Sequence, residues 1–408
     1  MRGTVDSYST KSGKRWRIRW DLPPDSETGE RRRGQRRGFA TKREASQALR
    51  EELRRVDRGS YVAPDQLTVK EWFEDEWLPS RKPQDGAAPG HRGQLALSTW
   101  SQYRTYVSAY IVPHIGHLPL QQLSATDLDR LYDLLERSGG RSGAGLAAKT
   151  LANTHGLVHK ALVDAVKRGR VARNVANQVE PPKAERTIMR WWSVEELRRF
   201  VQHVEDDRIY AAWLLFATTG MRRGEVAGLA WEDVDLDVGT LTVRWQLGLV
   251  DGQPTFKLRP KSRAGRRTMA LDPTTVEALR DHRRRQVEHR LAAGEAWETT
   301  ATDHLGTSRT GLVFRWEDGS LINPDRFTRW FKAHCEEAGL PVIRLHDVRH
   351  SYASAGLANA TGWHQVKVIS ERLGHANVAI TLDTYSHVLP AADEATAHTL
   401  ANIILHGS

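Results

Sequence analysis

Cysteine and long apolar runs are almost missing from this sequence. Cys335 is the only cysteine among 408 residues, which excludes a disulfide within the chain and a cysteine metal cluster, and fits a reducing, intracellular setting. No run of about 18 apolar residues exists, and a charged, mixed segment follows Met1. We therefore expect neither a membrane span nor a secretory signal peptide. Internal repeats and low-complexity tracts are absent as well.

Acidic residues are outnumbered by basic ones. The chain has 60 Lys and Arg against 50 Asp and Glu, a formal net charge of +10. This excess favours an anionic partner, with nucleic acid first, although a merely soluble basic protein is the alternative. Hydrophobic residues make up 39% of the chain, enough to bury a core. At about 100–200 residues per domain, the length predicts two to four domains.

Residues 1–62 predict a small β-sheet with one helix. Tryptophan and isoleucine alternate with arginine over residues 16–20, the period of a half-buried strand. A second basic strand or loop is expected at residues 31–39. Thr41, followed three residues later by glutamate, predicts a capped helix over residues 41–57.

Eight arginines of this first segment are candidates for DNA contacts, because basic strands can lie in a DNA groove. The alternative is a solvated basic face on a small sheet. The candidates are Arg15, Arg17, Arg19, Arg31, Arg32, Arg33, Arg36 and Arg37.

Residues 65–175 predict an all-helical domain, because apolar residues recur at three- and four-residue steps. Its Trp and Tyr side chains are interpreted mainly as core, with base stacking as the minority alternative. Residues 79–93 predict an insertion, and residues 176–192 an extended linker. The predicted helical segments are residues 68–78, 98–110, 124–135 and 147–167, and the first three begin after the candidate N-caps Thr68, Ser98 and Ser124.

Residues 193–408 predict a mixed α+β, mainly helical domain that begins at the candidate cap Ser193. Small polar residues predict a loop over residues 294–310, and an apolar periodic segment closes the chain at residues 395–405. Helices are expected near residues 193–204, 208–219, 222–229, 273–292, 324–338, 346–359 and 363–372, and strands at 241–243 and 268–271.

Two motifs in this domain are basic. In Thr-Gly-Met-Arg-Arg-Gly-Glu, Gly220 permits close helix approach, and Arg222 and Glu225 are three residues apart, so the carboxylate could orient the guanidinium. An ordinary surface ion pair is the alternative. Residues 259–268 predict a basic hairpin tip in which Lys261 could reach a phosphate, although a solvated charge run is the usual explanation.

Residues 345–385 hold the densest group of proton-handling side chains. His346 and Arg349 are three residues apart and share one helix face, which suits a phosphodiester. A Leu-Gly-His motif ends at His375, and a Thr-Tyr pair ends at Tyr385. Arginine, two histidines and tyrosine are what covalent attack on a DNA phosphate needs.

In this order, the motifs resemble the tyrosine recombinase (phage integrase) family over residues 190–390. The helical segment before them resembles the core-binding domain of that family, and the first 60 residues resemble the arm-binding domain of many integrases. The insertions near residues 79–97 and 294–310 depart from a minimal family core.

The resemblance implies a role for each motif residue. Tyr385 would attack the scissile phosphate and form a 3′-phosphotyrosyl link. Arg222 and Arg349 would hold the non-bridging oxygens, and Lys261 would protonate the departing 5′-oxygen.

The resemblance also assigns the histidines and the glutamate. His346 would assist proton transfer as a base toward the tyrosine, His375 would hydrogen-bond the phosphate, and Glu225 would support the geometry. No metal and no cofactor are implied, because Arg, Lys and His supply what Mg²⁺ supplies elsewhere. Asp347 is expected to brace its helix, and His350 to support packing.

The family reading predicts a site-specific DNA recombinase that integrates and excises a phage or another mobile element. Its partners would be double-stranded DNA attachment sites of core and arm type, further copies of itself in a tetramer on DNA, and host DNA-bending and directionality factors. It would work in the cytoplasm of a bacterial host, away from membranes. Two alternatives are a DNA-binding protein with a silent site and a type IB topoisomerase.

Overall fold

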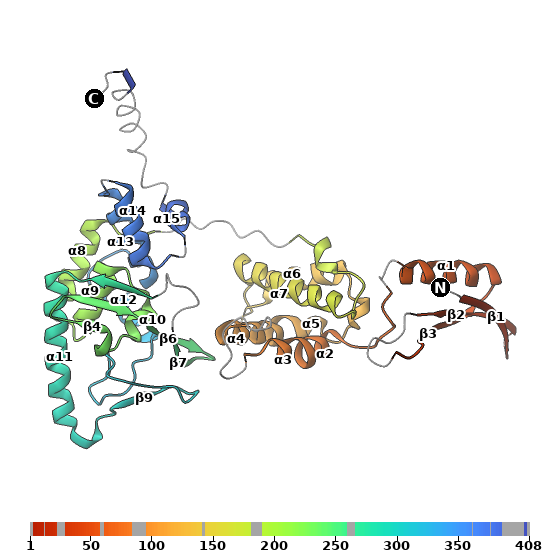
Figure 1. The fold of residues 1–408 in the computed structure, drawn as a ribbon, viewed down its shortest axis with the longest axis horizontal. Helices are drawn as coiled ribbons and strands as arrows, with labels where there is room; N and C mark the ends of the chain where they lie inside the picture. The colour runs from red at the N-terminus through yellow and green to blue at the C-terminus, as the bar shows by residue number, and fades with distance from the viewer. Residues whose placement is uncertain are drawn as a thin grey trace. The chain divides into compact units, whose positions relative to one another are not determined.

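The computed structural model describes residues 3–11, 13–22, 29–57, 61–83, 95–140, 143–180, 190–258, 266–360, 362–375, 377–385 and 404–405. The chain divides into two compact units, Met1–Arg186 and Thr187–Ser408. The first holds a small sheet with one helix and a set of packed helices, and the second is mixed and mainly helical (Figure 1). This architecture confirms the predicted fold class.

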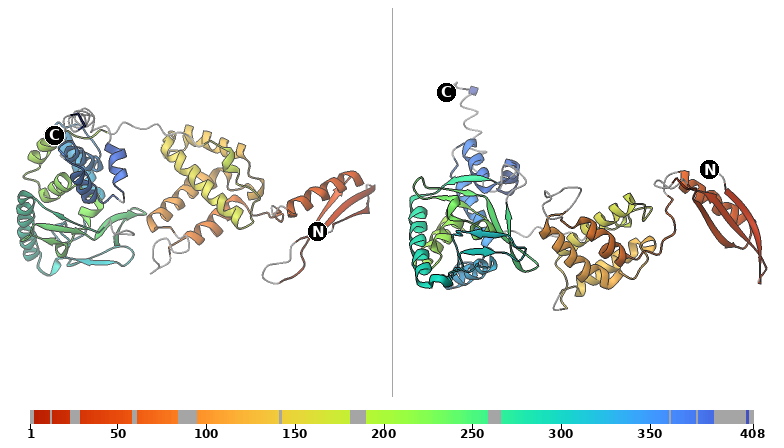
Figure 2. Two further views of the ribbon diagram at one scale, coloured as in Figure 1. Left: turned by 45° about the horizontal axis from the view of Figure 1, so that its top comes forward. Right: turned by 60° about the horizontal axis from the view of Figure 1, so that its bottom comes forward.

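The N-terminal sheet is antiparallel in the order β1-β2-β3, and α1 lies along one face of it (Figure 2). Ile18 and Trp20 are buried under this helix with Ala45 and Leu49, as the alternation predicted. Thr41 accepts a hydrogen bond from the backbone N–H of the third helical residue at 3.2 Å, so the predicted cap is confirmed. The elements are β1 (Gly3–Thr10), β2 (Gly13–Asp21), β3 (Arg33–Phe39) and α1 (Lys42–Asp57).

The other described residues of the first unit are mainly helical, and two of the helices there contain a π-helical stretch before a proline. The residues that precede Pro79 and Pro113 donate to carbonyls five residues back, from Leu78 to Phe73 and from Val112 to Val107. This wider turn accommodates a residue without an N–H inside a helix. The first such helix is α2 (Val69–Glu71), η1 (Trp72–Trp77) and α3 (Leu78–Arg81), and the second is α4 (Leu97–Tyr106), η3 (Val107–Ile111) and α5 (Val112–Ile115).

The remaining helices of this unit complete an aromatic core, in which Trp72, Phe73 and Trp77 are fully buried. The Trp77 indole donates to a carboxylate oxygen of Asp164 at 2.7 Å, so this ring serves packing, as expected. These elements are η4 (Leu120–Gln122), α6 (Ala125–Ser138), α7 (Ala148–Lys167) and η5 (Val175–Gln178).

Two sequence predictions for this unit were wrong. Ser98 is not an N-cap: α4 begins at Leu97 after Ala96, which makes no side-chain cap, whereas Thr68 and Ser124 form capping boxes. The extended linker does not begin at residue 176, because η5 covers residues 175–178 and apolar side chains there close the helical core. Residues 181–189 and the centre of the predicted insertion, 84–94, lie outside the described residues.

The second unit is built around α9, whose side chains are buried on almost every side. Trp213 and Phe216 of this helix contact Phe327, and Trp213 also contacts Phe331. The long helix α11 runs along the outer side of this unit (Figure 1). The predicted helices are present as α8 (Val194–His203), α9 (Tyr210–Thr219), α10 (Arg223–Ala227), α11 (Pro273–Ala293), α12 (Asp325–Glu337), α13 (Leu345–Ala358) and α14 (Trp363–Leu373), followed by α15 (Val378–Tyr385).

Among the described residues of this unit, the strands form three small antiparallel sheets, β4-β5-β8, β6-β7 and β10-β9. Asp251 and Gly252 both have positive φ at the turn between β6 and β7, the pairing typical of a two-residue hairpin. The strands are β4 (Val234–Asp235), β5 (Thr240–Val243), β6 (Trp245–Val250), β7 (Gln253–Leu258), β8 (Arg267–Ala270), β9 (Thr300–Thr302) and β10 (Ser308–Thr310), with short turns η6 (Trp231–Asp233) and η8 (Gly294–Ala296).

The loop prediction for residues 294–310 was wrong, because β9 and β10 pair there as a hairpin. Ala301 is fully buried between exposed Thr300 and Thr302, an alternation too short to stand out in the sequence. The carboxylate of Asp303 accepts backbone N–H groups from the turn and from Phe256 of β7, which fixes the hairpin to its neighbour. Of the predicted terminal segment, 395–405, only residues 404–405 are described. In the part of the chain that the structure describes, no helix is both long and apolar enough to cross a membrane.

Candidate active site and DNA-binding face

The candidate site begins where α9 ends. Gly220 follows the helix with φ of +63°, and a Cβ atom there would lie 2.7 Å from Cδ1 of Tyr352. Glycine is therefore required for both the turn and the close approach, as the motif predicted. The next turn presents Arg222 as the N-cap of α10.

Glu225 is the buried centre of this turn, with its side chain fully inaccessible. Its carboxylate accepts Nη1 of Arg222 at 2.9 Å and the backbone N–H of the same arginine at 2.9 Å. On its other side it accepts Nη2 of Arg267 at 2.7 Å. Burial would raise the pKa of Glu225, but hydrogen bonding and charge from Arg267, with the charge of Arg222, lower it to about 2. The carboxylate is ionised and holds two guanidiniums.

Arg267 is a site residue that sequence reasoning missed. It is 8% exposed, it belongs to β8, and its Nε donates to the backbone carbonyl of Arg372 at 2.5 Å. Residues 259–268 were predicted to form a basic hairpin tip, with a solvated charge run as the alternative, yet the side chain of Arg267 is buried. The two-residue period of a strand could have predicted this burial, because Arg267 lies on the same face as the apolar residue Met269.

Arg349 is held by backbone carbonyls from two helix ends. It is 3% exposed, it lies on α13, and its Nη1 donates to the carbonyl of Gly220 at 2.7 Å. Its Nη2 donates to the carbonyl of Leu373, at the end of α14. The guanidinium thus joins the segment before Arg222 to the segment before His375.

His346 and His375 are brought to the same cationic environment. Burial, followed by the charges of His350, Arg349 and Arg222, lowers the pKa of His346 to about 4. Burial, followed by the charges of Arg349 and Arg222, lowers the pKa of His375 to about 4. Both imidazoles are therefore neutral at pH 7, and Nδ1 of His375 lies 2.8 Å from the hydroxyl of Thr381.

The flanking residues act as braces. Asp347 pairs with Arg344 at 2.8 Å and closes a capping box at the start of α13, as predicted. The hydroxyl of Tyr352 accepts Nε of Arg372 at 2.7 Å, and the His350 ring lies 5.4 Å from the ring of His346. These contacts fix the helix that carries His346.

Two predicted residues are not placed. Lys261 lies outside the described residues. Tyr385 is the last residue of α15, and its side chain lies outside what the structure describes.

The arginines of the N-terminal sheet divide between its two faces. Arg15, Arg17 and Arg19 alternate with the buried residues of β2, so they occupy the face away from α1. Arg37 of β3 is the cross-strand partner of Arg17 and shares that face. Asp6 of β1 accepts from Arg19 and lies 3.7 Å from Arg17.

Arg36 differs from its neighbours because it pairs with Ile18 and shares the helix-covered face. Its Nη1 lies 3.9 Å from Glu52 of α1. Arg33 lies 3.4 Å from Asp21, and Arg31 and Arg32 are exposed ahead of β3.

Comparison with known proteins agrees with this geometry. Residues 190–391 match the model of the phage integrase family, and residues 7–54 match the arm DNA-binding domain. A XerC-like tyrosine recombinase of Caldanaerobacter subterraneus is 26% identical over 384 residues, 90% of each chain. An integrase of Streptomyces ambofaciens is 26% identical over 385 residues, 90% of this chain and 88% of that protein.

Solved structures share the fold. The Tn1549 transposon integrase in complex with a circular intermediate DNA has a TM-score of 0.63 at 17% identity, covering 82% of this chain and 99% of that one. A lambda integrase dimer bound to a core site has a TM-score of 0.53 at 14% identity, covering 78% and 94%. The chain belongs to the phage integrase family of tyrosine recombinases. It is a DNA breaking–rejoining enzyme with an arm DNA-binding domain.

Proposed function

We propose that this recombinase integrates and excises a phage or another mobile element at specific attachment sites. The observation that carries the proposal is the pair Arg222 and Arg349, fixed by Glu225 and by two backbone carbonyls beside two neutral histidines. Two preorganised guanidiniums suit the non-bridging oxygens of one phosphodiester. The arm domain would bind DNA at a second site, and a topoisomerase that only relaxes DNA would not need such binding.

In this proposal, the oxygen of Tyr385 attacks the scissile phosphorus, and the bond to the 5′-oxygen breaks. Lys261 gives its proton to that leaving oxygen, and Arg222 and Arg349 stabilise the charge on the phosphate oxygens. His346 accepts the tyrosine proton, which requires the neutral imidazole that its lowered pKa provides. The reverse steps rejoin the strand without an external energy source.

His375 and Glu225 have different tasks in this scheme. His375 donates a hydrogen bond to the phosphate, while Thr381 holds its other ring nitrogen. Glu225 contacts arginines rather than the phosphate, so it is a positioning residue. A bound phosphate brings negative charge to both histidines and raises their pKa values toward the ordinary range.

We further propose the assembly and its partners. The arm unit comprises residues 1–62, the core-binding domain residues 65–180, which include η5 and Val179, and the catalytic domain residues 193–408. Four copies would act together on core and arm sites, with host factors that bend DNA and set direction. The reaction would take place in the cytoplasm of a bacterial host.

A nicked suicide substrate tests the function. Protein should become covalently attached to DNA 3′ ends, and Tyr385→Phe should abolish this product while core-site binding persists. Tyr210→Phe, in the same unit, is the matched control and should retain the product. Covalent trapping in Tyr385→Phe would refute the nucleophile, and binding without any trapping in the wild type would favour a silent site. Strand exchange between two attachment sites, rather than relaxation alone, separates a recombinase from a topoisomerase.

A further inference from the structure

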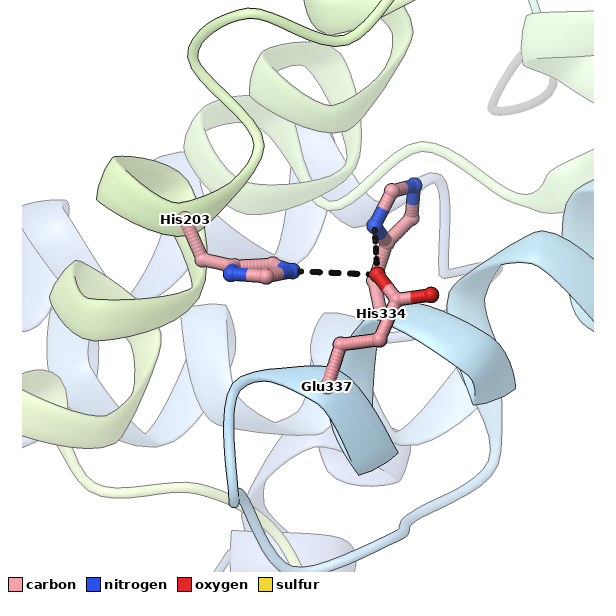
Figure 3. A group of neighbouring side chains, drawn as sticks. All are labelled: His203, His334 and Glu337. Atoms are coloured by element: carbon pink, nitrogen blue, oxygen red, sulfur yellow. Dashed lines mark ion pairs between the residues drawn. The ribbon is translucent and has the colours of Figure 1, made fainter.

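Three side chains converge at the ends of two helices of the second unit. None of them belongs to the cationic site, which is formed by Arg222, Glu225, Arg267, His346, Arg349 and His375. His203 is the last residue of α8, and Glu337 is the last residue of α12. His334 lies three residues before Glu337, so the two share one face of α12. Figure 3 shows these three side chains pointing toward one another.

The separations suit a shared metal ion better than hydrogen bonds. The Nε2 atom of His203 and the Nδ1 atom of His334 each lie 3.5 Å from Oε2 of Glu337. Hydrogen bonds from ring nitrogen to oxygen are shorter, at about 2.7–3.2 Å. Ligands bonded to one tetrahedral Zn²⁺ at about 2.0–2.2 Å are about 3.3 Å apart. All three ligand atoms lie within 4.8 Å of one another, close to that arrangement.

The second nitrogen of His334 is already oriented. Its Nε2 lies 2.9 Å from Oδ2 of Asp207, and the other oxygen of that carboxylate accepts the backbone N–H of Ile209 at 2.7 Å. With the proton on Nε2, the lone pair of Nδ1 faces Glu337. A histidine ligand braced by a carboxylate on its far nitrogen is the usual second layer of a metal centre.

Burial makes that lone pair costly to leave without a partner. The Nδ1 atom of His334 is buried and has no hydrogen-bond partner among the residues that the structure describes. The rings of Trp213 and His334 pack in a T-shaped arrangement, with their centroids 5.6 Å apart. His203 and Glu337 are partly open to solvent, so a cation can reach the group.

We propose that His203, His334 and Glu337 bind one divalent transition-metal ion, with Zn²⁺ as the first candidate. Two imidazoles and one carboxylate suit Zn²⁺, Co²⁺ or Ni²⁺, whereas Mg²⁺ and Ca²⁺ prefer oxygen ligands. Water completes the coordination from the exposed side.

The ion would join the ends of α8 and α12. These helices are already linked there, since Nη2 of Arg199 donates to the carbonyl of Ala338 at 3.2 Å. The site is structural and contributes no group to strand cleavage, so it is consistent with catalysis that needs no metal. Because a ligand that binds only the folded chain stabilises it, Zn²⁺ should raise the melting temperature.

The test uses the full chain, freed of metal by a chelator and titrated with Zn²⁺ against a chromophoric competitor. The wild type should bind one ion tightly, and Glu337→Gln should weaken binding at least about 10–100-fold. Glu336→Gln, at the preceding residue, and His117→Gln, at an exposed histidine elsewhere, should match the wild type. Co²⁺ should give the intense visible absorption of a four- or five-coordinate centre, and Glu337→Gln should lose it.

The outcomes separate the proposal from surface binding by other histidines. Equal Zn²⁺ affinity in Glu337→Gln and the wild type would overturn it, as would absence of tight binding in the wild type. If Glu337→Gln does not fold, His203→Gln, which changes an exposed side chain, carries the same comparison. The readouts use no DNA, so failure here leaves the recombinase proposal intact, and failed strand cleavage leaves the metal site intact.

Discussion

The second unit and the N-terminal sheet both gather arginines, but they hold them in opposite ways. Arg267 and Arg349 are buried, and hydrogen bonds to one carboxylate and to backbone carbonyls hold them in place. Arg15 and Arg37 project from the uncovered face of a small sheet. A buried charge must be paired, whereas an exposed charge is solvated and screened by salt.

Because of this difference, substitutions should act differently in the two regions. In the cationic site, each guanidinium depends on a few fixed partners, so one substitution disturbs several residues together. On the sheet face, each arginine would contribute a small share to DNA binding, so losses should add. Four predictions, taken from the largest expected effect to the smallest, examine the contrast.

Glu225→Gln should give the largest effect. The neutral side chain leaves buried Arg267 without its countercharge and removes the anchor of Arg222. Breaking a buried ion pair from one side costs about 3–5 kcal/mol. The free energy of unfolding, measured by urea denaturation, should fall by that amount, and strand cleavage should fall with it.

The matched control for this change is Glu277→Gln, which alters an exposed ion pair with Arg280 on α11. Exposed pairs contribute about 0–1 kcal/mol, so its stability should stay near that of the wild type. Equal stability of the two variants would mean that the carboxylate of Glu225 does not hold the site together.

Arg349→Lys should come second and should affect cleavage more than DNA binding. Lysine keeps the positive charge but cannot donate to the carbonyls of Gly220 and Leu373 in the same fork geometry. Loss of a preorganised donor costs about 10²–10³-fold in rate. Single-turnover cleavage of a suicide substrate should fall by this factor, while Arg284→Lys on the exposed side of α11 should not change it. A variant that cleaves at the wild-type rate would show that charge alone suffices.

The fold was largely predictable because its helices are long and strongly periodic. The segments from α8 to α14 were expected within a few residues of their observed bounds. Short elements were not predicted from the sequence, because three-residue strands such as β9 show too little alternation between buried and exposed residues. The end of the helical core at Val179 also escaped, because tertiary packing determines it.

The site was predictable in its motifs but not in its connections. Glu225 and Arg222 are three residues apart, and that spacing was enough to predict their pair. Arg267 was missed because its partner is 42 residues earlier, a contact that only the folded chain creates. The backbone carbonyls that hold Arg349 have no side-chain signature at all.

The histidines of the cationic site should give a smaller, pH-dependent effect. The pKa of His375 is about 4 in the folded chain and about 6.5 when unfolded. Between these values the unfolded chain binds more protons, so His375 contributes stability above pH 6.5 that is lost as the pH falls toward 4. His375→Gln should flatten this part of the stability curve, measured by urea denaturation from pH 7 to pH 4. His117→Gln is the control, and an unchanged slope in His375→Gln would contradict the burial of a neutral imidazole.

Substitutions on the N-terminal sheet should give the smallest individual effects, and they examine whether its two faces differ as the register indicates. Arg15→Ala and Arg37→Ala each remove a cation from the uncovered face, so each should lower the slope of log affinity against log salt by about 0.9 for arm-site DNA. The double variant should show about twice that change. Arg36→Ala, whose guanidinium faces Glu52 on the covered side, is the matched control and should keep the wild-type slope. If Arg36→Ala lowers the slope as much as Arg37→Ala, DNA binding is not confined to the uncovered face, and DNA contacts must extend around the edge of β3.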